Sequence, residues 1–135
     1  MLLEDEQRLV TAVRANNAAE VERLLKQKKR FSRTPKVLPN VVYEGQTILF
    51  YAARKNFVDI VEHLIAAKVD VKKGTDNGIT PLYIACQEGH IAVAGLLIAA
   101  GAYDVVGRVA GSPVPAPLLV ASQKGHVEIA KLWLY

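Results

Sequence analysis

Cysteine is nearly lacking in this 135-residue chain, since Cys86 stands alone. A chain with one cysteine forms no internal disulfide, which excludes a disulfide-stapled secreted fold and favours a reducing compartment. Long apolar runs are lacking too. The longest, Ile91–Ala102, is too short to span a bilayer and is interrupted by Gly95. The first residues, MLLEDEQ, carry acids where a signal peptide has a basic segment. We therefore expect a soluble cytoplasmic protein, with the nucleus left open as an alternative.

Motifs for catalysis and for cofactor binding are also lacking. The sequence has no Gly-x-Ser-x-Gly elbow, no P-loop and no dinucleotide fingerprint. Its His, Cys and Asp residues do not stand at metal-ligand spacing, so neither a metal nor a cofactor is predicted. Cys86 has no basic residue placed beside it, which favours a small buried side chain over a nucleophile. We predict that the protein is not an enzyme.

Positive charge is concentrated in one segment of the chain. The net charge is +4, yet six basic residues and no acid lie between Lys26 and Lys36. They are Lys26, Lys28, Lys29, Arg30, Arg33 and Lys36. Such a basic loop could bind nucleic acid, an anionic membrane or an acidic partner, or act as a nuclear-import signal. The alternative is a solvated loop beside a helix C-terminus, where Lys and Arg are favoured anyway.

Residues 77–102 read as two short helices with their own start and stop signals. Thr80 is a suitable N-cap, and Pro81 suits the first helical position, where its missing N–H costs nothing. Gly89 and Gly101 predict the two helix ends, because glycine tolerates the left-handed conformation found there. Helices this short do not persist alone in water, so they need neighbours of the same shape.

Those neighbours are present as repeats of the same pattern. Thr47 stands 33 residues before Thr80, and Leu118 stands 36 residues after Leu82. The equivalent small positions are Ala52, Ala85 and Ala121. Self-similarity at this period is typical of a helical solenoid.

On these residues the chain resembles the ankyrin-repeat family. The family pattern runs G-x-T-P-L-H-x-A-A, then G-H, V-x-x-L-L and G-A-D. The unit that starts at Gly78 matches nearly all of it, with Tyr83 in place of the His. The unit at Gly45 keeps the Thr, Leu and Ala-Ala, and the unit at Pro117 keeps the Pro, Leu and Gly-His. The resemblance covers roughly Leu9 to Tyr135.

The resemblance implies an all-α solenoid of about four stacked helix pairs with short β-hairpin-like links. We expect a single domain with a polar N-terminal capping repeat at 1–30, a basic and proline-containing insertion loop at 31–43, and further repeats at 44–73, 74–106 and 107–135. In the second repeat the helices are expected near Ile48–Lys55 and Val58–Ala67. Leu132–Leu134 is apolar, so a covering partner, self-association through this last helix or a longer natural chain all stay open.

Four further residues have a predicted structural role. Lys68 stands where the family has glycine, which costs on the order of 1 kcal/mol if the backbone is left-handed there. His90 and His126 occupy the Gly-His position and are expected to hydrogen-bond backbone groups at the helix–helix turn. His63 lies on an outer helix and is expected to be solvated.

The resemblance also implies a concave surface on which a partner protein binds. Its hairpin-tip positions are Tyr43, Glu44, Gln46, Asp76, Asn77 and Ile79. Its inner-helix positions are Ala15, Asn16, Arg54, Lys55, Gln87, Glu88, Gln123 and Lys124. The alternative is that these positions vary within the family only because they are exposed. We expect Tyr43, Ile79, Arg54 and Lys55 to dominate, because aromatic and Arg anchors dominate interfaces.

The function predicted from the sequence is a non-catalytic protein–protein interaction scaffold or adaptor. The alternative function is electrostatic binding of nucleic acid, an anionic membrane or an acidic partner through the basic loop Lys26–Lys36. The sequence does not identify the partner protein.

Overall fold

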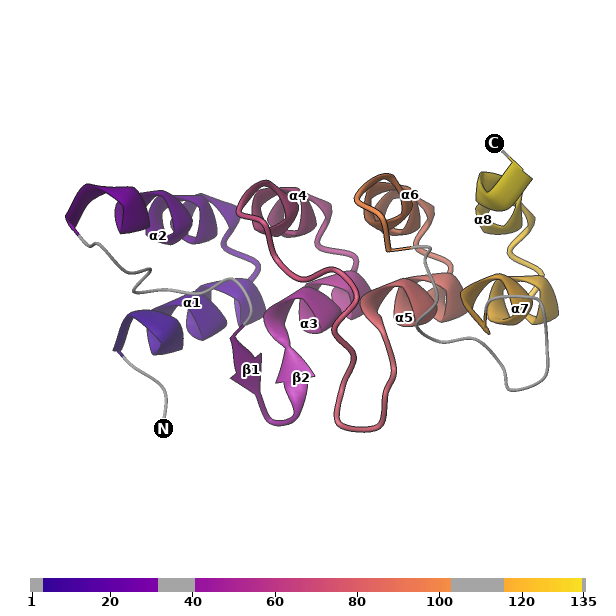
Figure 1. Cartoon of the computed structure of the whole chain (residues 1–135), viewed down its shortest axis with the longest axis horizontal. Helices are drawn as coiled ribbons and strands as arrows, with labels where there is room; N and C mark the ends of the chain where they lie inside the picture. Colours follow the sequence, from indigo (N-terminus) through magenta and orange to yellow (C-terminus); the bar gives the residue numbers. More distant parts are fainter. Residues whose placement is uncertain (1–3, 32–40, 103–115, 135) are drawn as a thin grey trace.

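The computed structural model describes residues 4–31, 41–102 and 116–134, and its helices form two layers (Figure 1). The inner layer contains α1 (Glu4–Arg14), α3 (Ile48–Lys55), α5 (Pro81–Glu88) and α7 (Ala116–Gln123). The outer layer contains α2 (Ala18–Phe31), α4 (Val58–Ala66), α6 (Ile91–Ala99) and α8 (Val127–Ala130), which continues into the 3-10 turn η1 (Lys131–Leu134). Each helix packs against the next helix of its own layer. The predicted solenoid of about four helix pairs is confirmed.

Two tips project from the inner layer, away from the outer helices (Figure 1). The first is a hairpin of β1 (Val42–Tyr43) and β2 (Gln46–Thr47), in which Val42 pairs with Thr47. Its turn residues Glu44 and Gly45 have φ values of 53° and 76°. Positive φ at both positions is the signature of a type I′ turn, which matches the twist of a two-residue hairpin.

The second tip is formed by residues 75–79 and has no strand, but it is closed by hydrogen bonds. Thr75 N donates to Ile79 O at 2.8 Å, and Gly78 N donates to Thr75 O at 2.8 Å. Gly78 has a φ of 80°, close to that of Gly45. The two tips are therefore equivalent elements, as the 33-residue repeat predicts.

The inner helices start and end as their sequences predict. Thr47 Oγ1 accepts from Phe50 N at 3.0 Å and Thr80 Oγ1 from Tyr83 N at 3.1 Å, so each Thr caps its helix. The caps that end α3 and α5 are Asn56 and Gly89, both left-handed. These local signals set the length of α3 and of α5 at about two turns.

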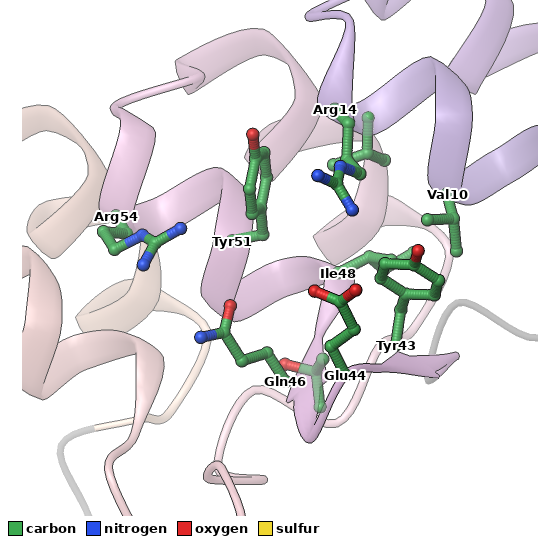
Figure 2. A pocket seen from close by; sticks show the side chains of 10 residues that line it. Val10, Arg14, Tyr43, Glu44, Gln46, Ile48, Tyr51 and Arg54 are labelled. Carbon is green, nitrogen blue, oxygen red and sulfur yellow. The ribbon is translucent and has the colours of Figure 1, made fainter.

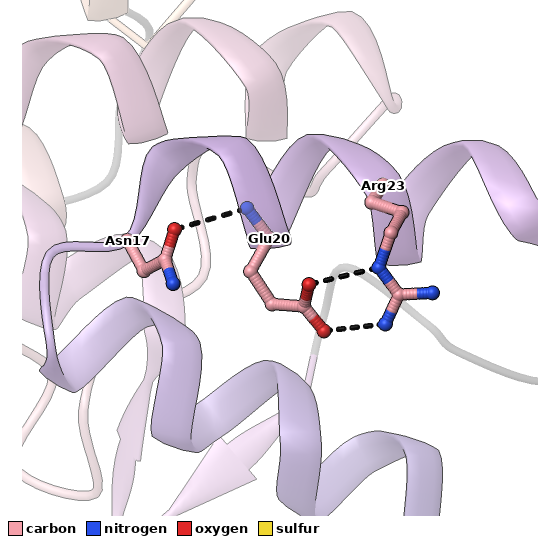
Figure 3. Close-up of polar contacts among 3 residues, drawn as sticks. All are labelled: Asn17, Glu20 and Arg23. Atoms are coloured by element: carbon pink, nitrogen blue, oxygen red, sulfur yellow. Dashed lines mark hydrogen bonds and ion pairs between the residues drawn. The ribbon is translucent and has the colours of Figure 1, made fainter.

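In the first repeat, Asn17 caps the start of α2, and side chains on α2 supply the polarity (Figure 3). Asn17 Oδ1 accepts from Glu20 N at 3.1 Å. The Glu20 carboxylate accepts from Arg23, with Oε2 2.8 Å from Nε, and this bond lowers the pKa of Glu20. A groove between α1 and α2 is lined mainly by polar side chains such as these. The side of the first repeat that faces away from the second is therefore hydrophilic.

The core runs as one continuous band between the two layers. Large side chains with at most 2% exposure come from every repeat: Leu9, Val13, Leu24, Leu49, Ile60, Leu64, Leu82, Leu97 and Ile129. Ala52, Ala85 and Ala121 have no exposed surface. Small residues at these equivalent sites let neighbouring inner helices approach closely, so the interior forms only when the pairs stack.

Two histidines join successive repeats. His90 Nε2 lies 3.0 Å from Arg54 O, and His126 Nε2 lies 3.2 Å from Gln87 O. The predicted hydrogen bonds to backbone are therefore confirmed. Each acceptor lies at the end of the preceding inner helix, however, so the bond holds one repeat to the next.

One expectation about polar residues was wrong. The basic loop was expected to begin at Lys26, but α2 continues to Phe31, so Lys26, Lys28, Lys29 and Arg30 are helical. Arg33, Lys36 and the proline-rich link before α7 lie outside the described residues. His63 is half-buried, with 31% of its side chain exposed, and its Nε2 lies 3.8 Å from Glu22 Oε2 on the neighbouring outer helix.

Candidate partner-binding surface

A cavity of about 250 Å³ opens where the first hairpin meets the inner helices (Figure 2). It is lined by Val10, Val13, Arg14, Tyr43, Glu44, Gln46, Thr47, Ile48, Tyr51 and Arg54. Helix α1 contributes the first three, the hairpin the next four and α3 the rest. The type I′ turn places Tyr43 and Gln46 opposite one another, and stacking of α1 on α3 places Arg14 beside the hairpin.

Cations and tyrosine rings alternate across this cavity. Arg14 Cζ lies 5.2 Å from the Tyr43 ring centroid and 5.8 Å from that of Tyr51. Arg54 Cζ lies 5.4 Å from the Tyr51 centroid, and Lys55 Nζ lies 5.9 Å from it. Figure 2 shows the Tyr51 side chain between Arg54 and Arg14. We name these five residues the arginine–tyrosine cluster.

The three cations of the arginine–tyrosine cluster have no acidic partner in the part of the chain that the structure describes. No carboxylate oxygen lies within 4.0 Å of Arg14, Arg54 or Lys55 there. Arg54 Nε is shielded from solvent and has no hydrogen-bond acceptor among the same residues. Glu44 is the single carboxylate in the described lining of the cavity. The local charge is therefore positive.

The structure brings together only part of the predicted partner-binding set. Tyr43, Glu44, Gln46 and Arg54 line the cavity, and Lys55 contacts Tyr51 beside it. Three other predicted residues, Asp76, Asn77 and Ile79, lie in the second tip. The remaining ones, Gln87, Glu88, Gln123 and Lys124, lie at the ends of α5 and α7. Of these, Gln87 is half-buried, while Glu88, Gln123 and Lys124 are exposed.

Sequence reasoning missed Arg14 because the register of the first repeat was placed one residue too late. Asn16 has a φ of 55° and is the left-handed residue that corresponds to Asn56. Arg54 stands two residues before Asn56, so its equivalent is Arg14. The expected pair Ala15 and Asn16 was therefore one residue out of register, because Ala15 is the equivalent of Lys55 and Asn16 that of Asn56. Counting back from the left-handed asparagine would have found Arg14.

Tyr51 was missed for a different reason. It lies in the middle of α3 and is half-buried, where an aromatic residue reads as part of the core. Its ring contacts Arg14 on α1, which is 37 residues away in the sequence. No pattern within one repeat indicates such a contact.

Three observations bear on other kinds of site. Cys86 is fully buried, and burial raises the pKa of its thiol to about 12, so it is a poor nucleophile. Within 4–31, 41–102 and 116–134, no three His, Cys, Asp or Glu side chains gather into a metal site. None of the helices described is both long and apolar enough to cross a lipid bilayer.

Comparison with known proteins gives the family. The profile described as ankyrin repeats, in three copies, matches residues 9–108. The chain belongs to the ankyrin-repeat family. This ankyrin-repeat chain is similar to protein phosphatase 1 regulatory subunit 27 from Homo sapiens, with 35% identity over 79 residues, which are 58% of this chain and 51% of the relative. The protein of the same name from Mus musculus is 33% identical over 79 residues, with the same coverage.

The family and these relatives support a protein-interaction role for this ankyrin-repeat chain and suggest that it is non-catalytic. The matched region spans about half the length of the curated relatives.

Proposed function

We propose that this ankyrin-repeat chain is a non-catalytic adaptor that binds a partner protein on the face made by the hairpin tips and the inner-helix ends. The observation that carries the proposal is the arginine–tyrosine cluster. Arg and Tyr are the side chains most enriched among residues that dominate binding energy. Here Arg14 and Arg54 line one concavity together with the two rings, and Lys55 lies beside it. Tyr43 is 38% exposed.

The surface is ordered before a partner arrives, which favours tight binding. Asp76 N donates to Gly45 O at 3.2 Å, so the two tips hold one another. His90 fixes the end of α3, where Arg54 and Lys55 lie. A surface that is already ordered loses little conformational entropy when it docks.

The relatives suggest the first partner to test. Their name describes a regulatory subunit of protein phosphatase 1, and the similarity covers 79 residues of this chain. We propose protein phosphatase 1 as a candidate partner of this chain. A binding measurement with the two purified proteins tests this partner, and it does so independently of which surface of the chain binds.

The surface itself is tested by affinity capture with a double variant, Arg54→Ala with Lys55→Ala. We expect this variant to lose a partner that the unaltered protein retains, with unchanged helical circular dichroism. The matched control is Asp59→Asn with Glu62→Gln, which changes two exposed charges on outer helix α4. Equal loss of the partner in both variants would place binding elsewhere, and loss of helicity in the first would make Arg54 and Lys55 structural.

The electrostatic alternative through Lys26–Lys36 stays a prediction. Lys26 pairs with Glu22 one turn earlier in α2, as expected of a cation near a helix C-terminus. Binding to nucleic acid through this segment would weaken steeply in a salt titration, because each phosphate contact releases counterions. We also propose a cytoplasmic location, on the basis of the single cysteine, and imaging of a fluorescently tagged protein tests it.

A further inference from the structure

We infer that the arginine–tyrosine cluster binds an acidic segment of the partner, in which at least two Asp or Glu side chains reach Arg14 and Arg54. The inference rests on the proposed function, because it names the chemistry that the same face recognises. The proposed ligand groups are the carboxylates of a protein segment.

The charge of the cluster is complementary to that of an acidic segment. Arg14 and Lys55 are exposed and Arg54 is half-buried, and all three cations face the Tyr51 ring. Within the described residues none of them has a carboxylate within 4.0 Å. Three cations held near one ring repel one another, and an anionic partner removes that repulsion.

The geometry of the guanidinium groups suits carboxylate ligands. A tyrosine ring covers the face of a guanidinium but leaves its N–H groups pointing outward in the plane. Those groups form two parallel hydrogen bonds with a carboxylate, which fixes both partners in register. The ring contacts restrict Arg14 and Arg54, which reduces the side-chain entropy lost when the carboxylates bind.

The placement of Arg14 and Arg54 determines how much of the acidic segment makes contact. Arg14 and Arg54 occupy equivalent positions of the first two repeats and lie on either side of Tyr51 (Figure 2). In an extended segment, alternate side chains share one face and stand roughly 7 Å apart, so neighbouring carboxylates of one face can reach both arginines. The position that holds Lys55 in the second repeat holds Glu88 in the third. The acidic segment therefore faces the first two repeats only.

Replacing Glu44 tests the inference, because the direction of the expected change in affinity is known. It lines the same cavity and is exposed at the hairpin turn. A carboxylate there repels an acidic segment, so its removal strengthens binding. If the partner segment were basic or neutral, removal of Glu44 would weaken binding or leave it unchanged.

The experiment uses the full chain labelled with ¹⁵N and a synthetic 15-residue peptide with Glu at alternate positions and Gly or Ser between them. The matched peptide has Gln in place of each Glu. Titration to millimolar peptide follows the amide shifts of residues around Tyr51. We expect the Glu peptide to shift these amide signals. Relative to the unaltered protein, the dissociation constant should be about threefold to tenfold higher in Arg14→Gln and about twofold lower in Glu44→Gln.

The control variant is Lys131→Gln, which removes a cation on the outer layer and should leave the dissociation constant unchanged. The inference is overturned if millimolar Glu peptide leaves the amide signals around Tyr51 unshifted, or if the Gln peptide shifts them equally. It is also overturned if the shifted signals belong to α2 around Lys26. Weaker binding in Glu44→Gln would overturn it as well. These failures leave the capture experiment unaffected, so they are distinguishable from failure of the proposed function.

Discussion

Asp76 lies directly against Gly45. Asp76 N donates to Gly45 O at 3.2 Å, and a Cβ built on Gly45 would lie 2.5 Å from Asp76 Oδ2. The tips of the second and third repeats are therefore in contact through a residue that has no side chain. Gly45 is needed both for its φ of 76° and for the room that it leaves.

The first prediction concerns Gly45→Ala. The positive φ and the crowded carboxylate should lower the free energy of unfolding by about 1 to 2 kcal/mol, measured by urea denaturation. Gly78→Ala is the matched control, because Gly78 has a φ of 80° but no atom within 4 Å of its built Cβ. Its cost should be about 1 kcal/mol. Adding Asp76→Ala to Gly45→Ala should relieve the crowding; a double variant less stable than Gly45→Ala would contradict this account.

The second prediction concerns the histidines that join the repeats. His90→Ala removes the bond to Arg54 O and should lower the free energy of unfolding by about 1 kcal/mol. His126→Ala should cost a similar amount, since it removes the bond to Gln87 O. Stability of a solenoid depends on its interfaces, so the double variant should also unfold over a broader range of urea. The control is His63→Ala, whose imidazole has no hydrogen bond to backbone among the described residues. A loss in His63→Ala as large as in His90→Ala would argue against the interface role.

The third prediction concerns Lys68, whose φ is 66°. The expected left-handed position is confirmed, so Lys68→Gly should remove backbone strain and raise the midpoint of thermal unfolding. The gain should be about 0.5 to 1 kcal/mol, because glycine also adds entropy to the unfolded chain. Lys68→Ala removes the same charge but keeps the strain, and it should give no gain. An unchanged or lower midpoint in Lys68→Gly would contradict the prediction.

The fourth prediction concerns the buried thiol of Cys86. Burial raises its pKa from an ordinary value of 9.0 to about 12. The folded state therefore holds the thiol proton above pH 9 while the unfolded state releases it, so stability falls between about pH 9 and pH 12. Cys86→Ala should flatten that part of the pH dependence, and comparison of the two proteins cancels the effect of tyrosine ionisation. A thiol-reactive dye should label Cys86 only under unfolding conditions; rapid labelling of the folded protein would contradict its burial.

The sequence anticipated several features that depend on residues close together in the chain. The capping hydroxyls of Thr47 and Thr80 act within three residues, and the helix end at Gly89 depends on its own φ. The repeat equivalence of Gly45 and Gly78 could also be read directly, and the structure gives both a similar φ. Steric and hydrogen-bonding rules of this range need no tertiary partner.

The end of α2 shows where local reasoning was incomplete. The cations between Lys26 and Lys36 predict a basic loop, yet α2 runs to Phe31. Lys, Gln and Arg have good helix propensity, and cations are stabilised near a helix C-terminus. The same local physics therefore favoured a longer helix, and the polarity of the segment obscured it.

The sequence by itself determined the repeat, the length of its inner helices and the family. The tertiary structure alone decided which groups meet across repeats: His90 with Arg54 O, Asp76 with Gly45, and Arg14 with Tyr51. Each of these contacts joins residues more than 30 positions apart in the chain. Their distances depend on how closely one helix pair stacks on the next, which is set by the whole buried band and not by any one segment.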